Sequence, residues 1–312
     1  NEMKQDIGVC KSVSITCISE TSWLDGDAWL KNVERAGGRN VDQWSVDWDE
    51  GNSGGYSSLI ETEGLDGSSR KFLLDSGWNN AYMDAAFECE GIDAMLARRE
   101  IEFLYVTHEH FDHYFGIASV LRHGPDITIM IPNTFHEKGH MLLKGARFPS
   151  SHAGNAFPHT GELVRHDPDI VYLLYPGCAS VTFDLDVPFG VRGEQSLFFN
   201  VQDKGIVCVT GCCHQNIVTF AEFARTRIEG GEDLYGLYGG LHIAPVGELD
   251  AKGEKMVEDL GRYGFRKIAC NHCTGLSAVR RMVELGYPVA GGTALNGPAS
   301  HLYIGNGDKI VF

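Results

Sequence analysis

The sequence predicts an α/β fold, and three observations support this class. Short β-branched and aromatic runs, typical of buried strands, recur along the 312 residues. Amphipathic stretches typical of helices stand between many of these runs. The runs at 101–106, 206–210 and 266–270 each lead into a segment that contains histidine. Since the ends of strands are a common place for sites in α/β proteins, these histidines are the first candidates for function.

In the first half of the chain, a hairpin and a broken helix precede the strand at 101–106. Residues 56–62 and 70–75 are predicted to pair around a turn near 64–67. Residues 80–99 show a helical pattern of apolar residues, interrupted at Gly91-Ile92-Asp93. The remaining predicted elements are strands at 12–18 and 127–132 and helices at 27–35, 116–122 and 135–144.

The second half is denser in predicted strands, as a second sheet requires. Residues 145–169 are predicted as a loop that carries His152, His159 and His166. The tail is predicted to pair 300–304 with 309–312 around Gly305-Asn306-Gly307. The other predicted elements are strands at 170–174, 179–183, 196–201, 206–210, 234–243 and 266–270 and helices at 217–224, 250–263 and 277–285.

A polar stretch at 19–55 holds four of the five tryptophans, Trp23, Trp29, Trp44 and Trp48. A connection this long inside a compact domain is usually a functional lid or a disordered segment. The tryptophans argue against disorder. We expect either a lid that places an aromatic wall over the site, or rings that simply pin a long excursion to the body of the fold.

The densest cluster of candidate ligands is the segment HEHFDH at 108–113. Along an extended segment alternate side chains share a face, so His108, His110 and Asp112 can converge. A helix beginning just after them would swing His113 away from these three. Two imidazoles on one side, with a carboxylate and a third imidazole displaced, suit two adjacent cations. Imidazole with carboxylate favours Zn, Fe, Mn or Co over Ca or Mg.

Two further histidines are predicted to join this site. His214 follows the strand at 206–210, and His272 follows the strand at 266–270, so both emerge at the same kind of sheet edge as His108. Because a strand followed by histidine occurs three times, we assign His108, His214 and His272 to one site.

The segment at 108–113 resembles the HxHxDH signature of the metallo-β-lactamase superfamily. The resemblance implies a four-layer αβ/βα sandwich in one domain spanning 1–312, with one or two metal ions, zinc above all and iron or manganese as alternatives, at the edge of two facing sheets. TGCCH at 210–214, GGLHI at 239–243 and HCTG at 272–275 are similar to the dihydropterin/ribofuranosylaminobenzene 5′-phosphate synthase-like branch. With FLLDSG at 72–77, the resemblance spans roughly residues 55–312.

The resemblance also implies roles for particular side chains. Cys212 takes the place of the usual bridging aspartate and offers a softer ligand. Asp75 would steady the histidine loop from behind, although an aspartate before glycine is equally typical of a plain turn. His159 could match the family's third metal motif, and His242 suits substrate or supporting work better than direct ligation. The expected metal ligands are His108, His110, Asp112, His113, His214, His272 and Cys212.

Composition limits the kinds of molecule that this protein is expected to bind. The net charge of −16 argues against a nucleic-acid surface, which needs a basic stripe. No apolar stretch approaches the 18 or so residues of a membrane span. The first residues have no apolar signal-peptide core, and nine scattered cysteines fit a reducing compartment, so a cytoplasmic protein with a small-molecule substrate is expected.

From these observations we predict a metal-dependent hydrolase, in which a metal-activated water attacks an electrophilic carbon or phosphorus of the substrate. Asp112 would hold a cation or orient the water and take its proton, while His242 or Tyr114 would steady the leaving group. A second interpretation is a pterin-cofactor biosynthetic enzyme, which follows from the resemblance to the synthase-like branch. A metal-holding sensor or redox protein is a third, and its thiols would be Cys212, Cys213, Cys270 and Cys273.

Overall fold

In the computed structural model, which describes residues 3–21, 26–52, 54–293, 295 and 301–312, one hydrogen-bonded sheet folds into two facing halves. β1 pairs along its length with β2, and among the described residues its register with β11 is the pair Cys10 and Val201, so the halves meet at this edge. The first half contains β1 (Cys10–Ser19), β2 (Ser57–Gly64), β3 (Ser69–Leu74), β4 (Phe103–Tyr105), β5 (Thr128–Pro132) and β8 (Leu163–His166). The second contains β9 (Tyr172–Tyr175), β10 (Cys178–Val187), β11 (Val191–Val201), β12 (Gly205–Thr210), β13 (Leu234–Gly239) and β14 (Lys267–Cys270).

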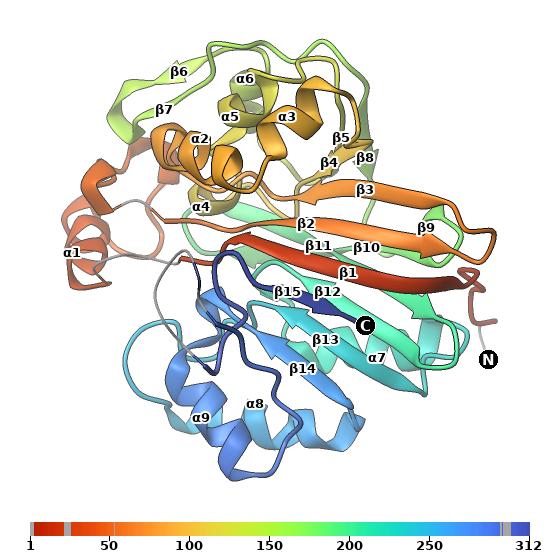
Figure 1. Cartoon of the computed structure of the whole chain (residues 1–312). Helices are drawn as coiled ribbons and strands as arrows, with labels where there is room; N and C mark the ends of the chain where they lie inside the picture. The colour runs from red at the N-terminus through yellow and green to blue at the C-terminus, as the bar shows by residue number, and fades with distance from the viewer. Residues whose placement is uncertain (1–2, 22–25, 53, 294, 296–300) are drawn as a thin grey trace.

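Helices cover the outer face of each half, as Figure 1 shows with the yellow and orange helices above and the blue ones below. The upper group is α2 (Asn80–Cys89), α3 (Ile92–Ala97), α4 (Phe111–Tyr114), α5 (Ile117–Leu121) and α6 (Glu137–Leu143). The lower group is α7 (Ile217–Arg227), α8 (Ala251–Leu260) and α9 (Leu276–Glu284). Side-chain caps begin several of them: Asn79 accepts from Tyr82 N at α2, and Asp250 accepts from Gly253 N at α8.

Three apolar cores separate the four layers. Met83 and Phe87 of α2 pack with Leu73 of β3 in the upper core. A lower core joins α7, α8 and α9 to the second half of the sheet. Between the halves, Phe72 of β3 lies parallel to Phe199 of β11, with ring centroids 6.5 Å apart. The chain is therefore a four-layer αβ/βα sandwich, as its sequence predicts.

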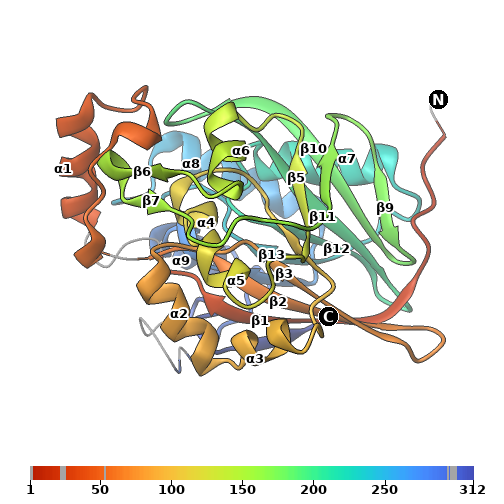
Figure 2. The same cartoon turned by 90° about the horizontal axis from the view of Figure 1, so that it is seen from above.

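The excursion at 19–55 is anchored to the upper core by two of its tryptophans. Trp48 stacks on Phe111 at a centroid distance of 3.7 Å, and Trp44 packs against Phe115. Trp23 and the side chain of Trp29 lie outside the described part of the structure. For Trp44 and Trp48 the anchoring interpretation fits and the aromatic wall does not, because both rings are buried away from solvent. Figure 2 shows the helix of this excursion, α1 (Gly26–Ala36), at one end of the molecule.

Two predicted elements are wrong. Residues 163–166, expected as loop, form β8, because their backbone pairs in parallel with β5. Residues 301–304, expected to pair with the tail, form no strand, and residue 300 lies outside the described residues. The tail strand β15 (Lys309–Val311) instead pairs antiparallel with β1, where Ile15 lies opposite Ile310. A partner about 300 residues away along the chain is invisible to local pattern.

Candidate metal centre

The histidine loop, residues 106–110, leaves β4 and leads into the short helix α4. Asp75, at the end of β3, holds this turn from behind. Its carboxylate accepts hydrogen bonds from Thr107 N (2.7 Å), from Thr107 Oγ1 (2.8 Å) and from His113 Nδ1 (2.6 Å). With Nδ1–H donated to Asp75, the Nε2 lone pair of His113 is left to face the site.

His108, His110 and His214 form a first group of donors whose ligand atoms all lie within 4.8 Å of one another. His108 Nε2 and His110 Nδ1 are 3.1 Å apart. Burial, reinforced by the neighbouring imidazoles, lowers the pKa of both His108 and His214 well below its usual value. Burial also lowers the pKa of His110 to about 4. At neutral pH these rings are uncharged, which is the form that binds a cation.

Asp112, His113 and His272 form a second group within the same limit. His272 Nε2 lies 3.2 Å from Asp112 Oδ2 and 3.2 Å from His113 Nε2. Burial alone would lower the pKa of His272, but the Asp112 carboxylate and Cys273 outweigh it and raise that pKa to about 9. Burial alone would raise the pKa of Asp112, but His113 and His272 hold it below its usual range. Asp112 is therefore ionised at neutral pH.

Asp112 does not share a face with His108 and His110, contrary to prediction. The extended alternation ends at His110, because α4 begins at the next residue and carries Asp112 and His113 together toward His272. His113 does turn away from the first pair, as expected, but Asp112 turns with it.

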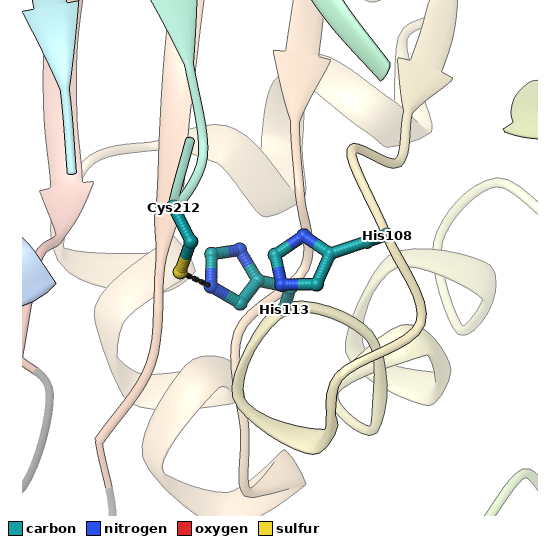
Figure 3. Close-up of side chains that lie close together, drawn as sticks. All are labelled: His108, His113 and Cys212. Carbon is teal, nitrogen blue, oxygen red and sulfur yellow. Dashed lines mark hydrogen bonds between the residues drawn. The ribbon is translucent and has the colours of Figure 1, made fainter. Parts of the chain in front are cut away.

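Cys212 lies between the two groups. Its Sγ is 3.1 Å from His113 Nε2, and it forms a further possible ligand set with His108 and His113 (Figure 3). The position suits a bridging donor, which is the place assigned to it from the sequence.

These side chains fit one or two transition-metal cations. His214 Nε2 is buried and has no hydrogen-bond partner among the described residues, an arrangement that is costly unless something binds it. Imidazole, carboxylate and thiolate together are donors that zinc, iron and manganese accept, and two separate groups match two adjacent ions.

Comparisons with known proteins show which family and which fold this chain is similar to. The model of the metallo-beta-lactamase superfamily matches residues 51–183. A solved structure described as Tm1679, a metal-dependent hydrolase of the beta-lactamase superfamily, superimposes with a TM-score of 0.55 over 96% of this chain and 98% of that one, at 19% identity. The fold is the metallo-β-lactamase fold.

A curated relative supports the branch suggested by the sequence. The 7,8-dihydropterin-6-methyl-4-(beta-D-ribofuranosyl)-aminobenzene-5'-phosphate synthase of Methanocaldococcus jannaschii is 25% identical over 258 residues, which cover 74% of this chain and 84% of that protein. Proteins of the metallo-β-lactamase superfamily usually bind divalent metals, in keeping with the histidine groups of this chain.

Two buried glutamates, which no local sequence pattern marks, support the candidate metal centre. Glu194 of β11 accepts hydrogen bonds from the backbone N–H groups of Cys212 (2.8 Å), Cys213 (3.1 Å) and His214 (2.6 Å). Glu20 accepts one from His272 N (3.1 Å). Burial raises the pKa of each glutamate to about 7 against the opposing effect of those N–H groups. Together with Asp75, one carboxylate holds each ligand-bearing turn.

Two candidate residues lie outside the site and are corrected. The Tyr114 hydroxyl donates to Gly139 O at 2.6 Å, and the ring is fully buried against Phe135, so Tyr114 cannot reach a leaving group. His159 Nε2 lies 2.6 Å from Ile127 O beside β5, and its ring belongs to none of the donor groups found among the described residues. His242, by contrast, is exposed and lies near His214, with ring centroids 4.6 Å apart.

An apolar pocket of about 250 Å³ opens above the donors. Leu30 and Val33 of α1 form one wall, and Phe189 lies with Pro188 in another. Arg39 is exposed and lines the same pocket. The other lining residues are His110, Phe111, Asp112, Cys212, His214, His242, Pro245, Val246, His272 and Cys273. Among its described residues, the excursion thus contributes aliphatic side chains, and neither Trp44 nor Trp48, to the space over the donor groups.

Proposed function

We propose that this protein is a metal-dependent hydrolase of a small ester-, lactone-, thioester- or phosphoester-type substrate, with zinc as the resident metal. The observation that carries the proposal is the convergence of two histidine-rich donor groups at the floor of one pocket. When bound, cations of this kind act as Lewis acids and lower the pKa of a water molecule to about 7.

The protein's own residues provide positioning and proton transfer. The His108, His110 and His214 rings, uncharged at neutral pH, supply nitrogen donors on one side. Asp112 stays ionised and faces His113 and His272 on the other, so it orients the attacking water and accepts a proton. His242 stands at the exposed side of the pocket and delivers a proton to the leaving group.

The pocket lining restricts the substrate to a compact apolar group. The space of about 250 Å³ has walls of Leu30, Val33, Phe189 and Val246. Asp112 is the carboxylate among the lining residues, and Arg39 is the guanidinium. A substrate with an apolar body in the pocket and an anionic group directed to Arg39 fits this surface best.

Elemental analysis of protein purified without added metal, followed by a screen of ester, lactone, thioester and phosphodiester substrates, tests the proposal. His110→Ala should lose both metal and turnover. His159→Ala, which removes a histidine outside the donor groups, is the matched control and should keep both. Full turnover by His110→Ala with its metal retained in stoichiometric amount would refute the assignment.

A second candidate is a biosynthetic step on a ribofuranosyl aryl phosphate, and the curated relative from Methanocaldococcus jannaschii is the observation that favours it. Arg39 offers a cation for a phosphate group. Binding of aryl phosphates should weaken in Arg39→Gln and persist in Arg35→Gln, an exposed arginine of α1 that does not line this pocket. Equal binding by both variants would remove the support from Arg39.

A further inference from the structure

Two cysteine thiols meet inside the pocket, although 61 residues separate them in the sequence. Cys212 follows β12 and Cys273 follows β14, the two strands on either side of β13. Their Sγ atoms lie, with a nitrogen of His272, within 4.8 Å of one another. Cys273 Sγ also lies 3.7 Å from the carbonyl oxygen of Cys212, so the side chain of one turn rests on the backbone of the other.

The local backbone makes room for this pair. A Cβ atom on Gly240 would stand 2.7 Å from Cys273 Sγ, a distance that real Cβ atoms essentially never show. Glycine at this position therefore lets the Cys273 thiol lie against β13 and face Cys212. A disulfide needs its two Sγ atoms about 2 Å apart. The two Sγ atoms lie within 4.8 Å of each other, so the side chains must rotate toward each other for the bond to form.

These two thiols differ from the other cysteines near the site because they line the pocket. Cys212 and Cys273 both line the pocket, although each is at most 4% exposed. Cys213 and Cys270 belong to the lower apolar core beneath it. Cys89, the last residue of α2, is the exposed cysteine among those described. A solute as small as a peroxide can therefore meet the pair at the pocket floor without unfolding the protein.

We propose that Cys212 and Cys273 form a reversible disulfide when the protein meets hydrogen peroxide. One thiol attacks a peroxide oxygen, the O–O bond breaks, and water and a sulfenic acid result. The second thiol then attacks the sulfenic sulfur, the S–O bond breaks, and a second water leaves. Two thiols are oxidised, one peroxide is reduced, and both thiol protons leave in water.

This bond would also change the metal centre. Cys212 Sγ now points at His113 Nε2, and bonding to Cys273 would turn it away from the position between the two donor groups. A disulfide sulfur is a far weaker metal donor than a thiolate. Oxidation should therefore release metal, a consequence that rests on the proposed metal site, whereas the disulfide itself does not.

The test treats the purified metal-bound protein with graded hydrogen peroxide, blocks free thiols and maps its peptides by mass spectrometry. The expected product is a cross-linked peptide pair joining Cys212 to Cys273, lighter by two hydrogen atoms and restored to free thiols by dithiothreitol. Metal release, followed with a chromogenic chelator, should rise with the amount of this cross-link.

Matched variants separate this pair from its neighbours. Cys273→Ser should abolish the cross-link, while Cys270→Ser, which breaks the C-x-x-C spacing but leaves the pocket thiols in place, should keep it. A cross-link between Cys270 and Cys273 would overturn the proposal. So would the absence of any Cys212–Cys273 cross-link at peroxide concentrations that oxidise the exposed Cys89. Neither result depends on turnover, so failure here is distinguishable from failure of the hydrolase assignment.

Discussion

Glu194 shows how much of this centre depends on side chains that touch no substrate. Its carboxylate lies fully buried in β11 and gathers three successive backbone N–H groups of the turn that presents Cys212 and His214. One of its oxygens also lies 3.4 Å from His108 Nδ1. A single group thus fixes donors that arrive from two different strands.

Replacing that carboxylate should weaken metal binding without unfolding the protein. In Glu194→Gln the side-chain amide keeps its shape but turns one acceptor oxygen into a donor, which repels the N–H groups it faces. We expect metal affinity to fall roughly 10–100-fold, the usual effect of losing a partner that orients ligands. Competition with a chelator measures it. Glu63→Gln, at an exposed glutamate of β2, is the control, and equal affinity in the two variants would contradict the role.

Metal loading should depend on pH through His272. Its pKa is raised to about 9 in the metal-free protein, so the ring holds a proton at pH 7 that a cation must displace. Affinity at the Asp112, His113 and His272 group should therefore rise with pH, by up to about tenfold per unit, until pH reaches about 9. Burial lowers the pKa of His108, His110 and His214, so the rings of that group carry no such proton. Calorimetric titration at pH 6 and pH 8 should show one pH-sensitive site, and two equally insensitive sites would contradict this.

At the scale of elements, the sequence predicts the ligand-bearing turns that follow strands. It does not predict the residues within strands that hydrogen-bond to those turns. The HEHFDH segment and the two later histidines carry a local signal, a strand that runs into ligand-type residues. Glu194 lies within β11, whose sequence VRGEQSLFFNV mixes polar and apolar residues, and nothing in that pattern indicates which loop a carboxylate of the strand holds. The pairing of Asp112 with His272 depends on where α4 begins, and a helix of four residues has too little pattern to place its first residue.

The excursion and the histidine loop are joined through Trp48 and Gln43. Trp48 stacks on Phe111, the first residue of α4, and the Gln43 amide donates to Glu109 O (2.7 Å) and accepts from Phe111 N (2.8 Å). The long connection at 19–55, for which the sequence left a lid and an anchor open, thus holds the backbone on either side of His110.

Removing this ring should destabilise the protein and loosen the loop. Trp48→Ala empties a buried site, so the free energy of unfolding should fall by about 3–5 kcal/mol. Trp48→Phe, which keeps an aromatic ring on Phe111, should lose considerably less. Urea denaturation of both variants measures the difference. A loss below about 1 kcal/mol in Trp48→Ala would show that the stack does not anchor the excursion.

At the scale of the whole molecule, the donor groups join the two halves of the sheet. His108, His110 and His113 come from the first half, whereas His214 and His272 come from the second. Within the described residues, the structure contains no helix long and apolar enough to cross a membrane.

Removing metal should lower the stability of the fold as a whole. A cation present at 100 times its dissociation constant stabilises the folded state by about 2.7 kcal/mol per site. Treatment with a chelator should therefore lower the thermal midpoint, and added zinc should restore it while magnesium does not, because imidazole and thiolate are poor magnesium ligands. An unchanged midpoint in metal-free protein would argue that the two halves are held by their apolar contacts alone.

The narrow join between β1 and β11 bears on when in the protein's life the metal arrives. A ribosome delivers the HEHFDH segment about 100 residues before His214 and about 160 before His272. Until the later strands dock, an incoming ion would find an incomplete set of nitrogen donors and would bind weakly. Metal uptake at the proposed site is thus expected to be a closing event of biogenesis, dependent on the cell's supply of free or chaperoned ions at that moment.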